Sequence, residues 1–321
     1  MSICVYGITA LEILRSSGRL LPDLLECPRS SSLEGCHSAS KAELDDLLPR
    51  LGAKTRPYQL MVPEGISTYD RSGVCRHRVR GKLPRASLIK AGRHVLVPTP
   101  ELVFCQMATV GEHDEMDLAL LGMELCGTYV LDASPDSWKG FTNLSEQTAS
   151  RERIAKCLDS YAGMTGAPKA RRALSLVLDG SNSPMETVLA ALITFPTKLG
   201  GCGLKGAALN YRVVLDDQTR VIDIAFPDKK VGLEYKGRAY HTIEQSGRDD
   251  RRQNGLVGSG WTIINVWYED LADPVLFENL ISAICRSLGV RLRISVAGYA
   301  NRRQILRSKT IPGLNIGADR R

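Results

Sequence analysis

The sequence predicts an α/β protein, α+β overall, in which a regular C-terminal domain follows an irregular N-terminal one. The chain has 321 residues, which suffices for about two domains of roughly 150 residues each. From residue 183 onward, apolar runs and turn residues alternate in the order helix, three strands, helix, strand, helix. Before residue 149, short strand-like runs are cut by Pro and Gly. These patterns predict a mixed sheet with flanking helices, preceded by a separate α+β domain.

Residues 1–148 form the predicted N-terminal domain. Three runs have strand character, at 58–63, 74–79 and 94–98. Helical spacing of apolar residues follows, where Thr99 can cap a helix with Pro100 in its first turn. Cysteine and histidine are zinc ligands, so four residues of this domain could form a zinc site: Cys36, His37, Cys75 and His77. Their spacing matches no standard zinc finger. The alternative is that the cysteines are ordinary buried residues and the histidines are ordinary surface residues.

Two further segments border the C-terminal domain. Residues 149–182 are amphipathic and predict a helical connector, whose basic side chains face either a nucleic-acid backbone or solvent. Residues 290–321 form a basic C-terminal tail. From residue 286 to the end, nine Lys or Arg accompany a single Asp, which accounts for the net charge of +7. Such a tail can neutralise phosphates, and a solvated or disordered tail is the alternative.

The composition indicates a cytoplasmic protein without a membrane partner. No apolar run approaches the ~20 residues that span a bilayer. The first residues lack a basic flank before their apolar part, which argues against a secretory signal. The nine cysteines are odd in number and include no Cys-x-x-Cys pair, so reduced thiols fit better than a disulfide framework.

Residues 183–289 form the predicted C-terminal domain. Ser183 suits a helix N-cap, Pro184 the first helical position, and Glu186 the third position of a capping box. The elements expected after this helix are a strand ALNYRVVL, a hairpin at 221–237, a polar helix at about 244–259, a strand WTIINVW and a helix PVLFENLISAICRSL.

A glycine motif between the first helix and the first strand needs a separate interpretation. Gly201, Gly203 and Gly206 match the spacing of the dinucleotide-binding fingerprint. That fingerprint requires a strand before it and a helix after it, and here the predicted order is reversed. The glycines are therefore expected to let the chain turn sharply from helix to sheet.

The hairpin at 221–237 carries charges that a purely structural strand would avoid. Asp223 interrupts the first apolar run, and Glu234 interrupts the second. Lys236 follows Glu234 at a spacing of two, so both side chains leave the same face of an extended strand. Two carboxylates and an ammonium on one small sheet predict a site for a metal ion and a water molecule. The alternative is a pair of edge-strand acids with Lys236 as a salt-bridge partner.

Residues 183–270 resemble the PD-(D/E)XK nuclease superfamily, and within it a group related to very-short-patch-repair endonucleases. The resemblance rests on SPMET (183–187), VIDIAFPD (221–228), GLEYKGRAYH (232–241) and DDRRQNGLVGSGW (249–261). It implies a restriction-endonuclease-like αβββαβ core with a mixed sheet. The N-terminal segments VPTPELVFCQMA (97–108) and LGMELCGTY (121–129) resemble proteins in which an AbiEi-type antitoxin region is fused to such a domain.

The resemblance implies a role for each polar residue of the hairpin. Asp223 and Glu234 would hold Mg²⁺ or Mn²⁺ with oxygen ligands. Lys236 would orient the attacking water and offset negative charge. Glu186 would complete the metal site, unless it only caps its helix. His241 could act as an acid or a base. The candidates for contacts with nucleic acid are Arg238, Arg251, Arg252, Arg302, Arg303 and Arg307.

The expected function is metal-dependent hydrolysis of phosphodiester bonds in nucleic acid, with DNA as the expected substrate, in a mobile-element, defence or repair context. A DNA-binding regulator or antitoxin-like protein that uses the nuclease fold as a scaffold is the first alternative. A protein-interaction module, with a partner bound by the N-terminal domain, is the second. The sequence gives no oligomeric state and does not distinguish nicking from double-strand cutting.

Overall fold

The computed structural model describes residues 2–68, 73–79, 81–92, 94–110, 113–131, 140–161, 163–215, 218–237 and 253–311. The chain divides into two compact units, unit 1 (Met1–Asp179) and unit 2 (Gly180–Arg321). The predicted connector 149–182 therefore belongs almost entirely to unit 1. Within the described ranges, no helix is both long enough and apolar enough to cross a membrane.

Unit 1 contains a mixed six-stranded sheet with the order β2-β5-β6-β1-β3-β4. Its strands are β1 (Ile3–Val5), β2 (Arg29–Ser30), β3 (Tyr58–Val62), β4 (Val74–Arg78), β5 (Leu88–Lys90) and β6 (Val95–Pro98). Strand β1 pairs in parallel with β6 and antiparallel with β3, whereas β3 pairs in parallel with β4. The three strand-like runs predicted in this domain are confirmed as β3, β4 and β6. Strand β4 lies at an edge of the sheet.

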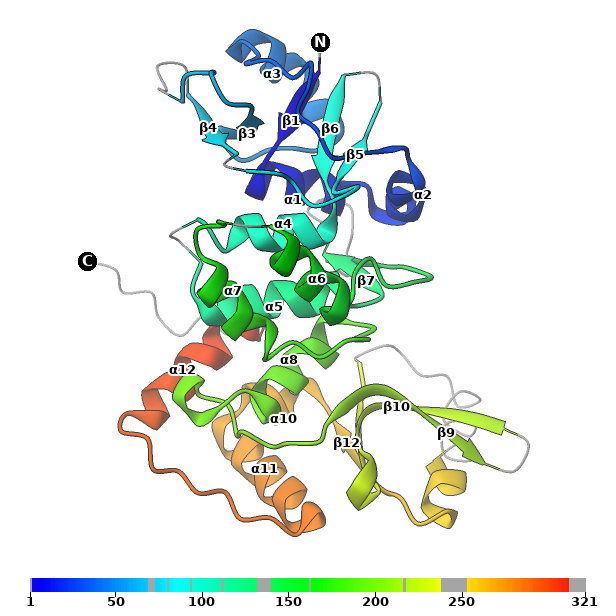
Figure 1. Cartoon of the computed structure of the whole chain (residues 1–321). Coiled ribbons are helices and arrows are strands. Elements are labelled where there is room, and N and C mark those ends of the chain that lie inside the picture. The colour runs from blue at the N-terminus through cyan, green and yellow to red at the C-terminus, as the bar shows by residue number, and fades with distance from the viewer. Residues whose placement is uncertain are drawn as a thin grey trace. The chain divides into compact units, whose positions relative to one another are not determined.

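Seven α-helices, two 3₁₀ turns and a β-hairpin make up the rest of the described part of unit 1. The helices are α1 (Gly7–Ser16), α2 (Leu21–Glu26), α3 (Lys41–Leu47), α4 (Pro100–Met107), α5 (Glu115–Leu125), α6 (Arg151–Ser160) and α7 (Ala167–Leu174), with 3₁₀ turns at Gly18–Leu20 and Pro49–Leu51 and a hairpin of β7 (Tyr129–Leu131) and β8 (Phe141–Asn143). Helices α4 to α7 pack as a group (Figure 1). The predicted cap of α4 is confirmed, because the Thr99 side chain accepts the Leu102 N–H.

Unit 2 is built on a four-stranded mixed sheet with the order β12-β11-β10-β9. Its elements are α8 (Pro184–Thr194), β9 (Ala208–Leu215), β10 (Gln218–Phe226), β11 (Val231–Tyr235), β12 (Thr262–Val266), α10 (Tyr268–Ala272), α11 (Pro274–Leu288) and α12 (Tyr299–Thr310), with 3₁₀ turns at Thr197–Leu199 and Pro227–Lys229. Strand β10 is antiparallel to β9 and β11, and β11 is parallel to β12.

The predicted element order of the C-terminal domain is found in unit 2, where two helices that were not predicted, α10 and α12, lie before and after α11. Residues 253–258 are helical, and the first part of the predicted helix at 244–252 lies outside the described residues. Leu256 from this helix packs with Ile222, Ala225 and Trp261 in a buried cluster. Ser183 caps α8, since its hydroxyl accepts the Glu186 N–H. The capped α8 then presents a continuous buried run from residue 186 to residue 193.

In the part of the predicted basic tail at 290–321 that the structure describes, residues 299–310 form α12. This helix packs on α8 and on the 3₁₀ turn after it. A Cβ atom at Gly200 would lie 2.4 Å from the Arg302 carbonyl oxygen, and the Tyr299 hydroxyl donates to the Gly201 carbonyl at 3.2 Å. Of the glycine motif, Gly201 permits a close backbone approach, because a Cβ atom there would lie 2.1 Å from the Phe195 carbonyl oxygen. The motif follows a 3₁₀ turn and precedes β9, which is not the context of a dinucleotide fingerprint.

Candidate functional site

The candidate site lies where the pairing of β10 with β11 ends. The last registered pair is Ile224 with Leu233, so Asp223 and Glu234 are the next residues on the two strands. The Tyr235 N–H donates to Asp223 Oδ2 at 2.8 Å. An aspartate side chain thus binds a backbone N–H of the neighbouring strand, and this bond fixes the position of the Asp223 carboxylate. The sheet therefore brings together the two acids that the hairpin sequence singled out.

Lys236 completes this arrangement. Its Nζ atom lies 2.7 Å from Glu234 Oε2, and 22% of the Lys236 side chain and 8% of the Glu234 side chain are exposed. The Lys236 N–H also donates to the Val266 carbonyl at 2.7 Å, which ties the residue to the end of β12. The short bond to Glu234 keeps the ammonium beside the carboxylates in a partly dry environment, where charge interactions are stronger than in water.

The second oxygen of Glu234 is the most unusual atom of the site. Glu234 Oε1 is buried, and it has no hydrogen-bond partner among the residues that the structure describes. Leaving a buried polar group without a partner costs about 1–3 kcal/mol, and more when the group is charged. A cation or an ordered water at this oxygen would remove that cost.

Glu186 lies close enough to Asp223 for the two carboxylates to repel each other. Burial raises the pKa of Glu186 to about 7, and the Asp223 charge adds to the rise. The neighbouring donors act in the opposite direction, because they favour the charged form. They are the Asn182 N–H at 2.8 Å, Asn210 Nδ2 at 2.7 Å and the Ser183 hydroxyl at 3.1 Å. Glu186 is therefore held by its own helix start and by β9.

Two asparagines that no sequence pattern singled out also belong to this site. Asn210 on β9 lies opposite Asp223 on β10, because the residues on either side of the two are registered pairs. On β12, Asn265 pairs with Glu234. Together Asn210, Asp223, Glu234 and Asn265 form a polar row across the four strands. Asn265 Oδ1 is buried and has no hydrogen-bond partner in the described ranges, like Glu234 Oε1 beside it. An Asn within an otherwise apolar strand is the signal that could have revealed both residues.

Asn210 has a specific structural reason to be an asparagine. Its φ angle is +47°, in the left-handed region that Asn tolerates better than most residues. Its amide donates to the Gly180 carbonyl at 2.7 Å as well as to Glu186, and its Oδ1 accepts from Asn182 at 2.6 Å. Asn210 thus joins β9 to the start of α8 and fixes Glu186 near Asp223.

The expected divalent cation fits this site in part. Carboxylate oxygens are the ligands that Mg²⁺ prefers, and Glu234 Oε1, which has no partner within the described part of the chain, suits a cation beside Asp223. However, the described residues include no group of three His, Cys, Asp or Glu side chains arranged to hold a metal ion. The expected three-carboxylate set is therefore not assembled, because the Glu186 carboxylate is engaged by Asn182, Ser183 and Asn210. The same finding gives the zinc hypothesis in unit 1 no ligand set.

Several predicted site residues cannot be assigned a position. His241, Arg238, Arg251 and Arg252 lie outside the described residues.

Two of the arginines expected to contact nucleic acid make structural contacts within unit 2. Arg307 is 7% exposed and donates to the Leu271 and Ala272 carbonyls at 2.9 and 2.7 Å. Arg303 lies over the Phe277 ring at 4.5 Å and pairs with Glu278 at 2.6 Å. Both therefore attach α12 to α11 and to the segment before it. Arg302 is exposed and donates to the Lys198 carbonyl at 3.1 Å.

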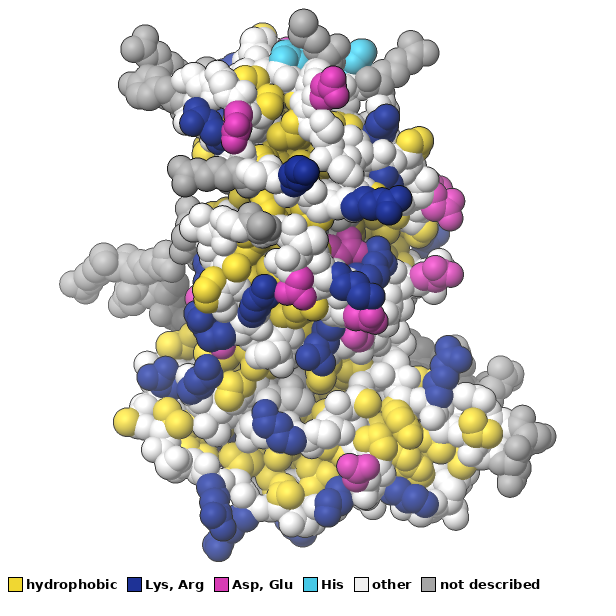
Figure 2. Space-filling model, in the orientation of Figure 1, with side chains coloured by type: hydrophobic (Ala, Val, Ile, Leu, Met, Phe, Trp, Pro, Cys, Tyr) yellow, Lys and Arg dark blue, Asp and Glu magenta, His cyan; other side chains and the backbone are white. Residues whose placement is uncertain are grey.

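Basic side chains lie over both units on the face in view. Figure 2 shows acidic side chains among them over unit 1 and few over unit 2.

Comparisons with protein families, with curated proteins and with solved structures gave no match for this chain.

Proposed function

We propose that unit 2 is a restriction-endonuclease-like domain that hydrolyses phosphodiester bonds in nucleic acid, with DNA as the substrate, in a metal-dependent reaction. The observation that carries this proposal is the meeting of Asp223, Glu234 and Lys236 at the end of the β10–β11 pairing. One buried oxygen of Glu234 lacks a donor among the residues that the structure describes. Two acids and one ammonium on adjacent strands are the groups that phosphodiester hydrolysis needs for charge stabilisation and for positioning a water.

Each residue has a separate task in this proposal. Asp223 and Glu234 would hold Mg²⁺ or Mn²⁺, which when bound supplies positive charge for the scissile phosphate. Lys236 orients the attacking water and offsets the negative charge that develops on the phosphate. Asn210 and Glu186 hold the start of α8 beside Asp223 and act as positioning residues. The sheet order, with one parallel and two antiparallel pairings, supports the proposed core.

The test compares cleavage of plasmid DNA by the full chain and by Asp223→Ala and Lys236→Ala, in Mg²⁺ and in Mn²⁺. We expect the full chain to nick or cut the plasmid and each variant to lose activity by about 100-fold or more. Lys229→Ala is the matched control, since Lys229 is an exposed lysine in the turn of the same hairpin. Equal cleavage by the full chain and both site variants would refute the assignment, because it would indicate a contaminating nuclease.

A metal-binding measurement gives a readout that is separate from activity. Titration of Mn²⁺ followed by electron paramagnetic resonance should show one site in the full chain and weaker binding in Glu234→Gln. Unchanged Mn²⁺ affinity in Glu234→Gln would remove Glu234 from the proposed ligand set.

A further inference from the structure

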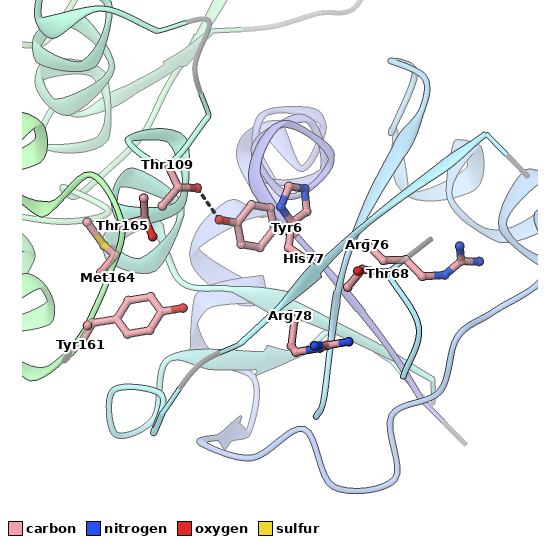
Figure 3. A pocket seen from close by; sticks show the side chains of 10 residues that line it. Tyr6, Thr68, Arg76, His77, Arg78, Thr109, Tyr161, Met164 and Thr165 are labelled. Atoms are coloured by element: carbon pink, nitrogen blue, oxygen red, sulfur yellow. Dashed lines mark hydrogen bonds between the residues drawn. The ribbon is translucent and has the colours of Figure 1, made fainter. Parts of the chain in front are cut away.

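Unit 1 contains a pocket that the nuclease proposal does not use. Its volume is about 420 Å³, within the usual range for small-molecule sites (Figure 3). Four parts of the chain line it: the residue before α1, strand β4 with the segment before it, the segment after α4 and the segment after α6. Among the described residues that line the pocket, none is acidic. We call it the Tyr6–Tyr161 pocket, after the two tyrosines that line it.

One side of the pocket is made of aromatic rings and hydroxyl groups. Tyr6 stacks on His77 with ring centroids 3.9 Å apart, and its hydroxyl hydrogen-bonds with that of Thr109 at 2.5 Å. These contacts fix the Tyr6 ring before any ligand arrives. In Figure 3 the Tyr161 hydroxyl extends toward the space that Tyr6 and Thr165 border. Burial raises the pKa of Tyr161 to about 12, so this hydroxyl keeps its proton at neutral pH and can donate.

The other side of the pocket carries positive charge. Arg76 and Arg78 belong to the edge strand β4. One guanidinium nitrogen of Arg76 donates to the Ser38 hydroxyl, and one of Arg78 donates to the Ile66 carbonyl. A guanidinium has five N–H donors, so each has further donors to offer a ligand. Burial lowers the pKa of His77 to about 4, so this ring is neutral at pH 7 and the two arginines supply the charge.

We propose that the Tyr6–Tyr161 pocket binds a nucleotide, either free or as the 5′-phosphorylated end of a strand. Arginines with no carboxylate beside them in the described lining, together with hydroxyl donors, suit a phosphate ester. The Tyr161 ring and Met164 provide the flat and apolar surface on which a base packs. Inorganic phosphate alone would leave most of the volume unfilled. The pocket lies entirely within unit 1, so its ligand does not depend on the chemistry proposed for unit 2.

The test is calorimetric titration of the full chain with AMP, adenosine and inorganic phosphate. We expect AMP to bind at least about tenfold more tightly than either fragment, since only AMP uses both sides of the pocket. Arg78→Ala and Tyr161→Phe should each weaken AMP binding by about tenfold. Arg50→Ala is the matched control. It removes one positive charge from an exposed ion pair with Asp46, away from the pocket lining, and should bind AMP normally.

The two sources of the nucleotide are separated by competition. A 5′-phosphorylated dinucleotide that displaces AMP indicates the end of a strand, and failure to displace it indicates a free nucleotide. Adenosine binding as tightly as AMP would overturn the proposal, as would AMP affinity that is the same in Arg78→Ala, Tyr161→Phe and the full chain. Absence of AMP binding at millimolar concentration in the folded chain would also overturn it. Circular dichroism of each variant checks that the fold is kept.

Discussion

Glu186 should make unit 2 less stable as the pH rises from about 4.5 to about 7. Its side chain is buried at 7% exposure, and its pKa is raised from the ordinary 4.5 to about 7, first by burial and then by Asp223. Between these two values the unfolded chain has already released the proton that the folded chain still holds. Stability therefore falls with rising pH across this interval, which is the opposite of the trend for a salt-bridged acid.

The size of this effect follows from the two pKa values. An interval from 4.5 to about 7, at about 1.36 kcal/mol per pH unit, amounts to about 3 kcal/mol. Glu186→Gln removes the titration but keeps an oxygen to accept from Asn182 and Asn210, and its amide can donate to the Ser183 hydroxyl. We expect the variant to match the wild-type stability near pH 5 and to exceed it by up to about 3 kcal/mol at pH 8.

Urea unfolding at pH 5, 6.5 and 8 measures the effect. In a Trp138→Phe background, tryptophan fluorescence reports on unit 2 alone, because the other two tryptophans, Trp261 and Trp267, belong to that unit. Glu278→Gln makes the same chemical change at an acid whose side chain is 62% exposed, and it should leave the pH dependence unaltered. Asp223→Asn should shift the upper end of the pH interval downward, since it removes the second cause of the raised pKa. An equal loss of stability in wild type and Glu186→Gln between pH 5 and pH 8 would contradict a raised pKa of Glu186 in the folded chain.

Three further predictions concern packing and capping. Arg307→Met should lower the free energy of unfolding of unit 2 by about 1–3 kcal/mol, because two backbone carbonyls lose their donor. Arg302→Met, at an exposed position on the same helix, should change this free energy little, and urea unfolding of both variants makes the comparison. Gly201→Ala places a Cβ atom 2.1 Å from the Phe195 carbonyl oxygen and should lower the free energy of unfolding by about 1–3 kcal/mol in the same assay. Gly258→Ala has open space at its Cβ atom and should not lower this free energy by a comparable amount. Asp114→Ala removes both capping bonds at the start of α5 and should lower unit 1 stability by about 1 kcal/mol in thermal unfolding.

Features encoded by a few neighbouring residues could be predicted from the sequence. The caps at Thr99 and Ser183 depend on side chains three residues or fewer from the N–H groups they accept, so local spacing is sufficient. The hairpin acids were also visible, because a charge inside an apolar run is unusual in any strand. The proximity of Asp223 and Glu234 then follows from the register that a short hairpin turn imposes.

Features that depend on distant segments could not be predicted in this way. Asn210 matters because it contacts Glu186, which lies 24 residues away in sequence, and no local pattern announces that contact. Arg307 lies in a segment with the composition of a basic tail, yet its side chain is buried because α12 packs against α11 and the segment before α11. The sequence gives the number of basic side chains in a segment. Whether these side chains are buried depends on the elements that pack over them, which the local sequence does not specify.

The closure of unit 2 by α12 has a consequence for the order in which the protein can form during synthesis. Tyr299 reaches back 98 residues to Gly201. At ribosomal rates of about 5–20 residues per second, these 98 residues take about 5–20 s to make. Unit 1 can fold during this interval, since all its residues precede Gly180. Unit 2 must wait for its final helix, and until then the apolar surface that α12 covers stays open to chaperones, proteases and other nascent chains.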